Sequence, residues 1–169
     1  PDDVIVVHPG RYSGFTVDKP LTVFGAISGT LRPHVSGHVR VENLAASKTA
    51  LLHRLRVDSL DLRNCQGNVI VDDLSTTLTS ITSCLSVALR NSTLMDSFHA
   101  ATIACRFSKV WIDRCTVEHR YAIRPRDGQD AIRVRGGRLS VSASDGSPFR
   151  NVGVQGQHAR AYPNCGAVT

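Results

Sequence analysis

Aliphatic residues return along this chain at nearly regular intervals, each within a short run of alternating apolar and polar residues. The intervals between successive members of this ladder are 18, 21, 19, 22 and 29 residues. A period near 20 that is built from short strands and turns is typical of a β-solenoid, in which each repeat forms one coil. The members are Val23, Val41, Leu62, Ile81, Ile103 and Ile132.

A second ladder runs alongside the first and indicates two strand positions in each coil. Its members are Val69, Val87, Val110 and Leu139, at intervals of 18, 23 and 29 residues. Intervals that vary in this way favour a right-handed helix with unequal turns over a left-handed helix with a strict six-residue repeat. We therefore predict an all-β fold, a right-handed parallel β-helix of about seven coils over residues 1–154, followed by a terminal cap or loose tail over residues 155–169.

Composition agrees with one folded domain and narrows the class of partner. Of the 169 residues, 41% are hydrophobic and 20% are charged, which excludes a disordered chain. No apolar run approaches the ~20 residues that span a bilayer, so we expect no membrane insertion. The net charge is +6, but the basic residues are spread along the chain and aromatics make up only 5%, which argues against specific nucleic-acid binding. Binding of an acidic polysaccharide is at least as compatible with an arginine-rich surface.

The five cysteines have neither the Cys-x-x-Cys spacing nor the histidine partners of a zinc site. Cys65, Cys84 and Cys105 each follow a member of the first ladder by two or three residues. We therefore predict that these three occupy one equivalent position on successive coils, where thiols pack as small hydrophobic groups. An odd total and placement on adjacent strands argue against a disulfide framework.

The opening of the chain combines a strand, a tight turn, a second strand and a corner in a specific order. The residues that define it are Pro9, Gly10, Tyr12, Lys19, Pro20, Leu21 and Gly25. This pattern resembles the first coil of the pectin-lyase-like superfamily, and the resemblance implies a right-handed parallel β-helix. It implies no single activity, because lyases, esterases, epimerases and non-catalytic surface proteins share this opening.

Two later segments are similar to pectate lyases in particular. Residues 110–116 are similar to their Val-Trp-Ile-Asp-His segment, and residues 127–137 to their acidic run and the strand after it. In that family, acidic side chains hold Ca²⁺ and an arginine abstracts a proton from the substrate uronate. The resemblance implies Asp113, Asp127 and Asp130 as metal ligands, and Arg114, Arg124 or Arg126 as the catalytic base. The chain departs from the family where Arg114 replaces the histidine, and the acidic run offers fewer carboxylates than calcium sites usually take.

An insertion at residues 118–130 interrupts both ladders and is the first candidate for a binding loop. It holds His119, Arg120 and Tyr121 close to the arginines and aspartates named above. Arginines in such a loop could bind carboxylates or sulfates of a glycan in a forked geometry, and Tyr121 could stack on a sugar ring. The alternative is a solvated loop whose charges only keep it soluble.

Trp111 lies between two apolar residues of a predicted strand, so alternation places its side chain on the outer face. There it could form a sugar platform, or it could pack beneath a loop. Asp72, Asp73 and Asp113 fall near one column on neighbouring coils, which suggests an acidic cluster. The alternative is that these aspartates bond to the backbone of the coil turns.

Three functions follow from these patterns. The first is a polysaccharide-interacting β-helix that binds acidic glycans without a complete catalytic set, within a secreted or cell-surface protein. The second is a pectate-lyase-like polysaccharide lyase that uses Ca²⁺ and an arginine base. The third is a structural or assembly module whose exposed faces or ends stack into oligomers. No Gly-x-Ser-x-Gly or phosphate-loop segment supports another enzyme class.

Overall fold

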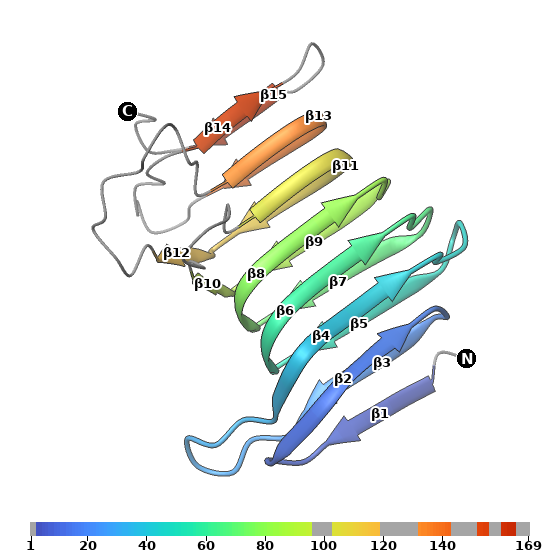
Figure 1. Ribbon diagram of the computed structural model, residues 1–169, viewed down its shortest axis with the longest axis vertical. Helices are drawn as coiled ribbons and strands as arrows, with labels where there is room; N and C mark the ends of the chain where they lie inside the picture. Colours follow the sequence, from blue (N-terminus) through green and yellow to red (C-terminus); the bar gives the residue numbers. More distant parts are fainter. Residues whose placement is uncertain (1–2, 96–102, 119–131, 143–151, 156–159, 165–169) are drawn as a thin grey trace.

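The computed structural model describes residues 3–95, 103–118, 132–142, 152–155 and 160–164, and these form a parallel β-solenoid. Figure 1 shows the strands stacked as successive rungs along one axis, and all fifteen belong to a single wound sheet. The strands are β1 (Asp3–Val7), β2 (Arg11–Val17), β3 (Leu21–Gly25), β4 (His34–Glu42), β5 (Thr49–His53), β6 (Arg56–Arg63), β7 (Asn68–Asp72), β8 (Ser75–Thr82), β9 (Ser86–Arg90), β10 (Thr93–Met95), β11 (Ile103–Asp113), β12 (Thr116–Glu118), β13 (Ile132–Ser142), β14 (Val152–Gln155) and β15 (Arg160–Asn164).

The predicted fold class, an all-β parallel β-helix, is confirmed. The described residues trace about five turns, fewer than the seven expected. Residues 155–169, expected to form a cap or tail, contain β15, which pairs with β13. The division of the chain at residue 154 stays a prediction. In the part of the chain that the structure describes, no helix is long and apolar enough to cross a membrane.

One side of the solenoid, here called the first face, is built from β1, β3, β5, β7, β9, the second half of β11, the second half of β13 and β15. The second ladder of the sequence runs through this face in register: Val69 pairs with Val87, Val87 with Val110 and Val110 with Leu139. Those of its side chains that the structure describes are buried. The prediction of a self-stacking inward column is therefore confirmed.

The first ladder of the sequence mixes positions from two sides of the solenoid. Val41, Leu62 and Ile81 do form one column, on the second face, which comprises the later parts of β4, β6 and β8 and the first part of β11. Val23 does not belong to it, because it pairs with Leu52 on the first face. Ile103 pairs with Thr79, two residues away from the Ile81 position. Inward aliphatic residues occupy both faces, so a common period could not assign each one to its own column.

The coils turn at two recurring corners, each marked by a residue with positive φ and then a buried residue. Asn43, Asn64 and Ser83 turn the chain after β4, β6 and β8. The other corner is turned by Arg54, Asp73, Asn91 and Arg114. Asparagine and aspartate tolerate this left-handed backbone better than other residues with a side chain. Backbone bonds such as Asn64 N–H to Thr82 O, 3.0 Å, carry the ladder through the corners, so the coils bend at the same places.

Two of the three aligned cysteines occupy an equivalent position on successive coils, as predicted, and the third does not; the shared position is a corner. Cys65 and Cys84 are equivalent and follow Asn64 and Ser83. Cys105 instead pairs with Ile81 inside a strand, and Ser108 takes the next corner position, where its Oγ accepts the Cys84 backbone N–H at 3.0 Å. Cys115 lies at the other corner. The thiols of Cys65, Cys84 and Cys115 are free and buried.

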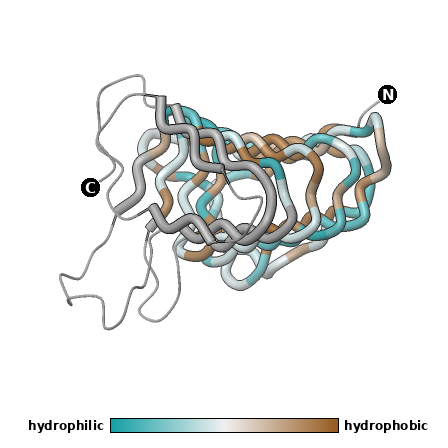
Figure 2. The backbone as a smooth tube through the Cα atoms, turned by 90° about the horizontal axis from the view of Figure 1, so that it is seen from above, coloured by the Kyte–Doolittle hydropathy of each residue, from teal (hydrophilic) through white to brown (hydrophobic). Residues whose placement is uncertain are grey.

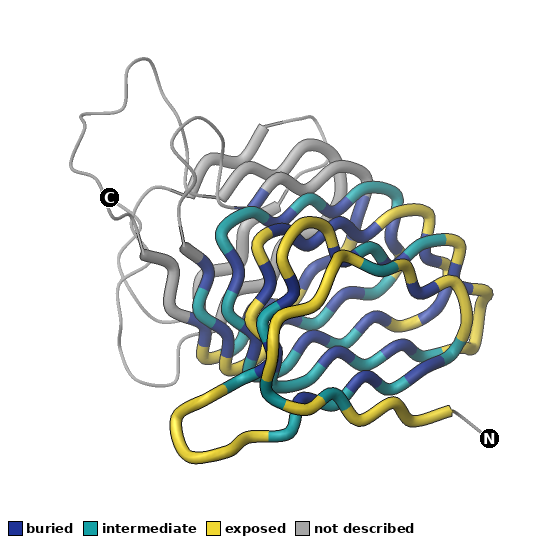
Figure 3. The backbone as a smooth tube through the Cα atoms, turned by 60° about the horizontal axis from the view of Figure 1, so that its bottom comes forward, coloured by how far each residue is buried: buried dark blue, intermediate teal, exposed yellow. Residues whose placement is uncertain are grey.

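The core is an aliphatic stack inside the coils. Buried positions alternate with exposed or half-buried ones along the strands (Figure 3), and apolar residues recur with the same alternation (Figure 2). The largest fully buried side chains are Leu44, Leu52, Leu55, Leu60, Leu62, Leu74, Ile81, Leu89, Leu94, Ile103 and Ile112. The inside is mainly aliphatic, with a few buried polar residues such as Thr76 and Thr79, so most polar groups able to meet a ligand lie on the outer faces and at the corners.

Candidate functional site

Two columns of outward side chains run along the first face, parallel to the solenoid axis. Successive residues of a strand point to opposite faces, so the residues between the buried positions face outward. The apolar column consists of Leu51, Ile70, Ala88 and Trp111, on β5, β7, β9 and β11. The charged column consists of His53, Asp72, Arg90 and Asp113 on the same four strands. The first face therefore offers an apolar stripe with charged groups along one side.

A groove of about 440 Å³ lies on this face between β7, β9 and β11. Ala88 stands between Ile70 and Trp111 in the apolar column, and its short side chain leaves the space that the larger neighbours enclose. The groove is lined by Asn68, Val69, Ile70, Ser86, Ala88, Arg90, Trp111, Asp113 and Arg114. Its walls thus combine an aromatic ring, an amide, a hydroxyl and charged groups of both signs.

Trp111 points outward, as alternation along its strand predicts. Its side chain is 43% exposed, whereas Val110 and Ile112 on either side of it are 1% exposed. Trp111 is also among the large hydrophobic residues that remain exposed in the described part of the chain. An indole in this position presents apolar surface to the groove.

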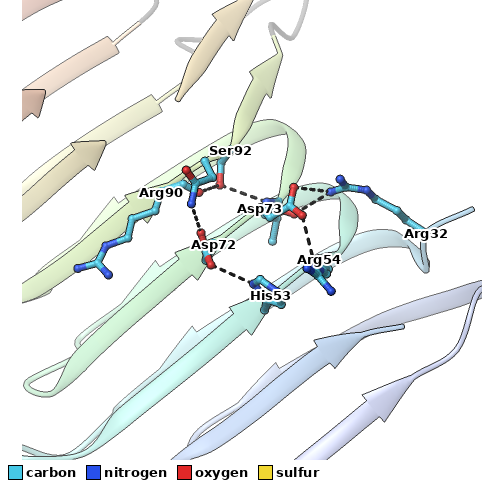
Figure 4. Close-up of polar contacts among 9 residues, drawn as sticks. Arg32, His53, Arg54, Asp72, Asp73, Arg90 and Ser92 are labelled. Carbon is cyan, nitrogen blue, oxygen red and sulfur yellow. Dashed lines mark hydrogen bonds and ion pairs between the residues drawn. The ribbon is translucent and has the colours of Figure 1, made fainter. Parts of the chain in front are cut away.

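Arg90 supplies a cationic group at the edge of the groove. Figure 4 shows its side chain extended away from Asp72, the neighbouring residue of the charged column. Among the described residues its guanidinium has no hydrogen-bond or ion-pair partner. Arg114, the other groove arginine, lies with its Nε 3.3 Å from Asp113 Oδ2. Arg90 is therefore the groove cation that is available to a ligand.

Asp72 is held in place by its neighbours on both sides. Its Oδ2 is 3.1 Å from His53 Nδ1, and its Oδ1 accepts a hydrogen bond from Asn91 Nδ2 at 2.7 Å (Figure 4). The His53 ring stacks on Phe24 with 5.1 Å between the ring centres. This carboxylate is consequently oriented and partly compensated beside the groove.

Asp73 makes its contacts at the adjacent corner and does not line the groove. Arg32 Nη1 donates to the Asp73 carbonyl oxygen at 2.9 Å and to its Oδ1 at 2.7 Å. Arg54 Nε lies 3.7 Å from Asp73 Oδ2, and its guanidinium lies over the Phe24 ring. These contacts tie three coils together at one corner, which is a structural role.

The predicted acidic cluster is not formed in the way the sequence suggested. Asp72 and Asp113 do share a column, but Arg90 stands between them, so they lie two coils apart. Within the described ranges, no three side chains of His, Cys, Asp or Glu gather as a metal site would require. Asp127 and Asp130, the other two predicted calcium ligands, lie outside the described residues, so a calcium site with Asp113 stays a prediction.

Arginines on the other faces are mostly paired with aspartates. On the second face, Arg63 forks onto Asp61, with Nε and Nη2 each 2.7 Å from a carboxylate oxygen, and Arg40 Nε lies 3.2 Å from the same group. The hydrogen bond that Arg63 donates to Asp61 raises the pKa of Arg63 above its usual value. Among the arginines whose side chains the structure describes, Arg32, Arg40, Arg54 and Arg63 are thus paired with carboxylates away from the groove.

The structure places only some of the predicted site residues. Trp111, Asp113 and Arg114 come together at the groove. The remaining candidates lie outside the described residues and stay predictions: His119, Arg120, Tyr121, Arg124, Arg126, Asp127 and Asp130.

Sequence reasoning missed five residues that line the groove: Asn68, Ile70, Ser86, Ala88 and Arg90. A signal for them existed, because Ile70, Ala88 and Trp111 each follow a member of the second ladder by one residue. The outward column was therefore readable once that ladder was known. The groove itself depends on Ala88 being small between two larger neighbours.

Comparison with known proteins adds no assignment. The chain matches no family model, no curated protein and no solved structure. The function is therefore inferred from the groove and its chemistry.

Proposed function

We propose that this protein binds an acidic polysaccharide in the groove between Trp111 and Arg90. The observation that supports this most directly is the pairing of an exposed indole with a guanidinium that has no partner among the described residues. An aromatic side chain offers a rigid apolar surface to the C–H groups of a sugar ring. A guanidinium binds a carboxylate or sulfate through two parallel hydrogen bonds.

The other groove residues suit the hydroxyl groups of a sugar. Asn68 provides both donors and acceptors, and Ser86 provides a hydroxyl of either role. These groups are carried on β7 and β9, whose neighbouring strands hold them in register. A site built on paired strands keeps its geometry better than one on loops, so little ordering is needed when the ligand binds.

A binding function is favoured over the lyase alternative. The candidate base that the structure describes, Arg114, carries a guanidinium next to Asp113, and a guanidinium offers hydrogen-bond donors and no acceptor. The catalytic base of a lyase must accept a proton, whereas an arginine paired with a carboxylate acts as a hydrogen-bond donor. The groove supplies recognition groups but no acid and base set among the described residues.

The test is titration calorimetry with polyuronates, sulfated glycans and neutral glycans. We expect binding of acidic glycans only, with a loss of at least about tenfold in affinity in Trp111→Ala and Arg90→Gln, as for the removal of central contacts. Leu31→Ala is the matched control for removing an exposed apolar side chain, since Leu31 is 64% exposed and lies outside the groove.

Arg56→Gln is the control for charge, because Arg56 is exposed on another side of the solenoid. An equal loss of affinity for acidic glycans in Arg56→Gln and Arg90→Gln would show that net charge alone attracts the glycan. Absence of binding by every acidic glycan would overturn the proposed function.

A further inference from the structure

Charge alternates in sign along the column that borders the groove. Asp72, Arg90 and Asp113 are direct register partners on β7, β9 and β11. Neighbouring strands lie ~4.8 Å apart, so a carboxylate follows the Arg90 position after one strand spacing in each direction. One further strand beyond Asp72 lies His53, which can carry a positive charge. The order along the axis is therefore His53, Asp72, Arg90, Asp113.

The two carboxylates flank the Arg90 position in the column, and each has donor groups beside it. Asp72 accepts a hydrogen bond from Asn91 and faces His53, and Asp113 faces Arg114. A carboxylate oxygen can accept more than one hydrogen bond, so both groups can still receive donors from a ligand. Arg90 differs, because its guanidinium has no partner among the described residues. The pattern presents one site for an anion between two sites for hydrogen-bond donors.

We propose that the groove selects anionic glycans in which acidic sugars alternate with uncharged sugars. This inference rests on the proposed function. A chain that follows the apolar column advances by a distance comparable to one strand spacing for each sugar. With an acidic sugar at Arg90, the sugars on both sides lie near Asp72 and Asp113. There an uncharged sugar donates hydroxyl or amide hydrogen bonds, whereas a uronate meets a like charge.

The size of the selection follows from the charges. Two like charges a strand spacing apart repel in water by enough to lower affinity about fivefold, and less in salt. A uniformly charged chain meets two such contacts, so we expect the alternating glycan to bind at least about tenfold more tightly. The next acidic sugar of the alternating chain falls near His53, two strands from Arg90.

The experiment compares two hexasaccharides at equal ionic strength by titration calorimetry. One alternates glucuronate with N-acetylglucosamine, and the other is oligogalacturonate, with an acid on every sugar. We expect tighter binding of the first by the wild type. Asp72→Asn and Asp113→Asn should each strengthen oligogalacturonate binding about threefold to fivefold. Each variant should therefore reduce the difference in affinity between the two hexasaccharides.

Asp58→Asn is the matched control, since Asp58 is an exposed aspartate that pairs with His34 away from the groove. It should leave both affinities unchanged. Circular dichroism shows whether each variant folds. If Asp72→Asn does not fold, the oligogalacturonate affinity of Asp113→Asn tests the inference by itself.

Equal affinity of the wild type for the two hexasaccharides would overturn this inference. So would an unchanged affinity for oligogalacturonate in folded Asp72→Asn and Asp113→Asn. The proposed function would survive that result as long as binding still depends on Trp111 and Arg90. If neither hexasaccharide binds, and no other acidic glycan does, both proposals fail together.

Discussion

Arg32 and Asp73 are 41 residues apart in the chain, yet the Arg32 guanidinium donates to both the carbonyl oxygen and the carboxylate of Asp73. Arg32 lies in the segment between β3 and β4, and Asp73 turns the corner after β7. The contact therefore holds a connecting segment against a corner further along the solenoid. Both side chains are about one-third exposed, so the pair combines partial burial with hydrogen bonds to a charged group.

Replacing Asp73 should separate the contribution of these contacts from that of the corner backbone. Asp73→Asn keeps a residue that tolerates positive φ and loses the ion pairs, and we expect it to cost about 1 kcal/mol in the free energy of unfolding. Asp73→Ala should cost about 1 kcal/mol more, because alanine is strained at φ 52°. Urea denaturation measures both. Equal stability of the two variants would contradict the backbone argument.

Gly25 should tolerate no side chain, because the next coil approaches it closely. A Cβ at this position would lie 2.1 Å from the carbonyl oxygen of Arg54, a backbone atom that cannot move aside alone. We expect Gly25→Ala to lower the free energy of unfolding by more than about 2 kcal/mol. Gly10→Ala is the control, since its Cβ would meet only the end of the Tyr12 ring at 3.3 Å. A loss in Gly10→Ala as large as in Gly25→Ala would count against close coil packing as the cause.

The Asp58 carboxylate should add a small contribution to the free energy of unfolding, and this contribution should disappear at low pH. Hydrogen bonds from His34 and from the backbone N–H of Gly37 lower the pKa of Asp58 below its ordinary value of 3.8. A carboxyl group whose pKa is lower in the folded state than in the unfolded state stabilises the protein at pH values above its unfolded pKa. For Asp58 this contribution is lost as the pH falls below 3.8 and through the folded pKa. Because the side chain is half exposed, we expect less than about 1 kcal/mol.

The check on Asp58 is the free energy of unfolding as a function of pH. In Asp58→Asn the loss of stability below pH 3.8 should be smaller than in the wild type. Asp18→Asn, at an exposed position of the first coil, serves as the control for removing a surface carboxylate. Identical pH profiles for the wild type and Asp58→Asn would rule out this contribution.

The thiol of Cys115 should be chemically inert in the folded protein. Burial raises the pKa of Cys115 to about 11, and the thiolate is the form that reacts with alkylating reagents. We expect no labelling of the Cys115 peptide by iodoacetamide at pH 8 under native conditions, and complete labelling in concentrated urea. Peptide mass spectrometry reads both. Rapid native labelling would mean that the corner after β11 opens readily.

Local geometry explains which features could be predicted. Val69, Val87 and Val110 could be placed inside from the sequence, and Trp111 outside, because alternation along a strand depends only on the backbone of that strand. The fold class followed from the period, since each coil must repeat its strands and corners to stack. The exposed fractions of Val110 and Trp111, 1% and 43%, agree with that reasoning.

Features that depend on register between distant strands could not be predicted. Val23 and Val41 follow one another in the first ladder but lie on different faces, and Cys105 pairs with Ile81 inside a strand where the spacing suggested a position equivalent to Cys84. Connections of different length shift the position at which a coil turns, so sequence intervals do not translate directly into columns. The corners show this most clearly, because Cys84 is followed in its column by Ser108.

The sequence by itself determined a stack of parallel coils with an apolar interior and an outward tryptophan. These properties follow from strand alternation and from the repeat, which are local. Only the tertiary structure decided that Arg90 stands between Asp72 and Asp113, beside a groove with Ala88 at its centre. That arrangement depends on hydrogen bonds between strands about twenty residues apart, and those bonds set the register that brings the charges and the indole together.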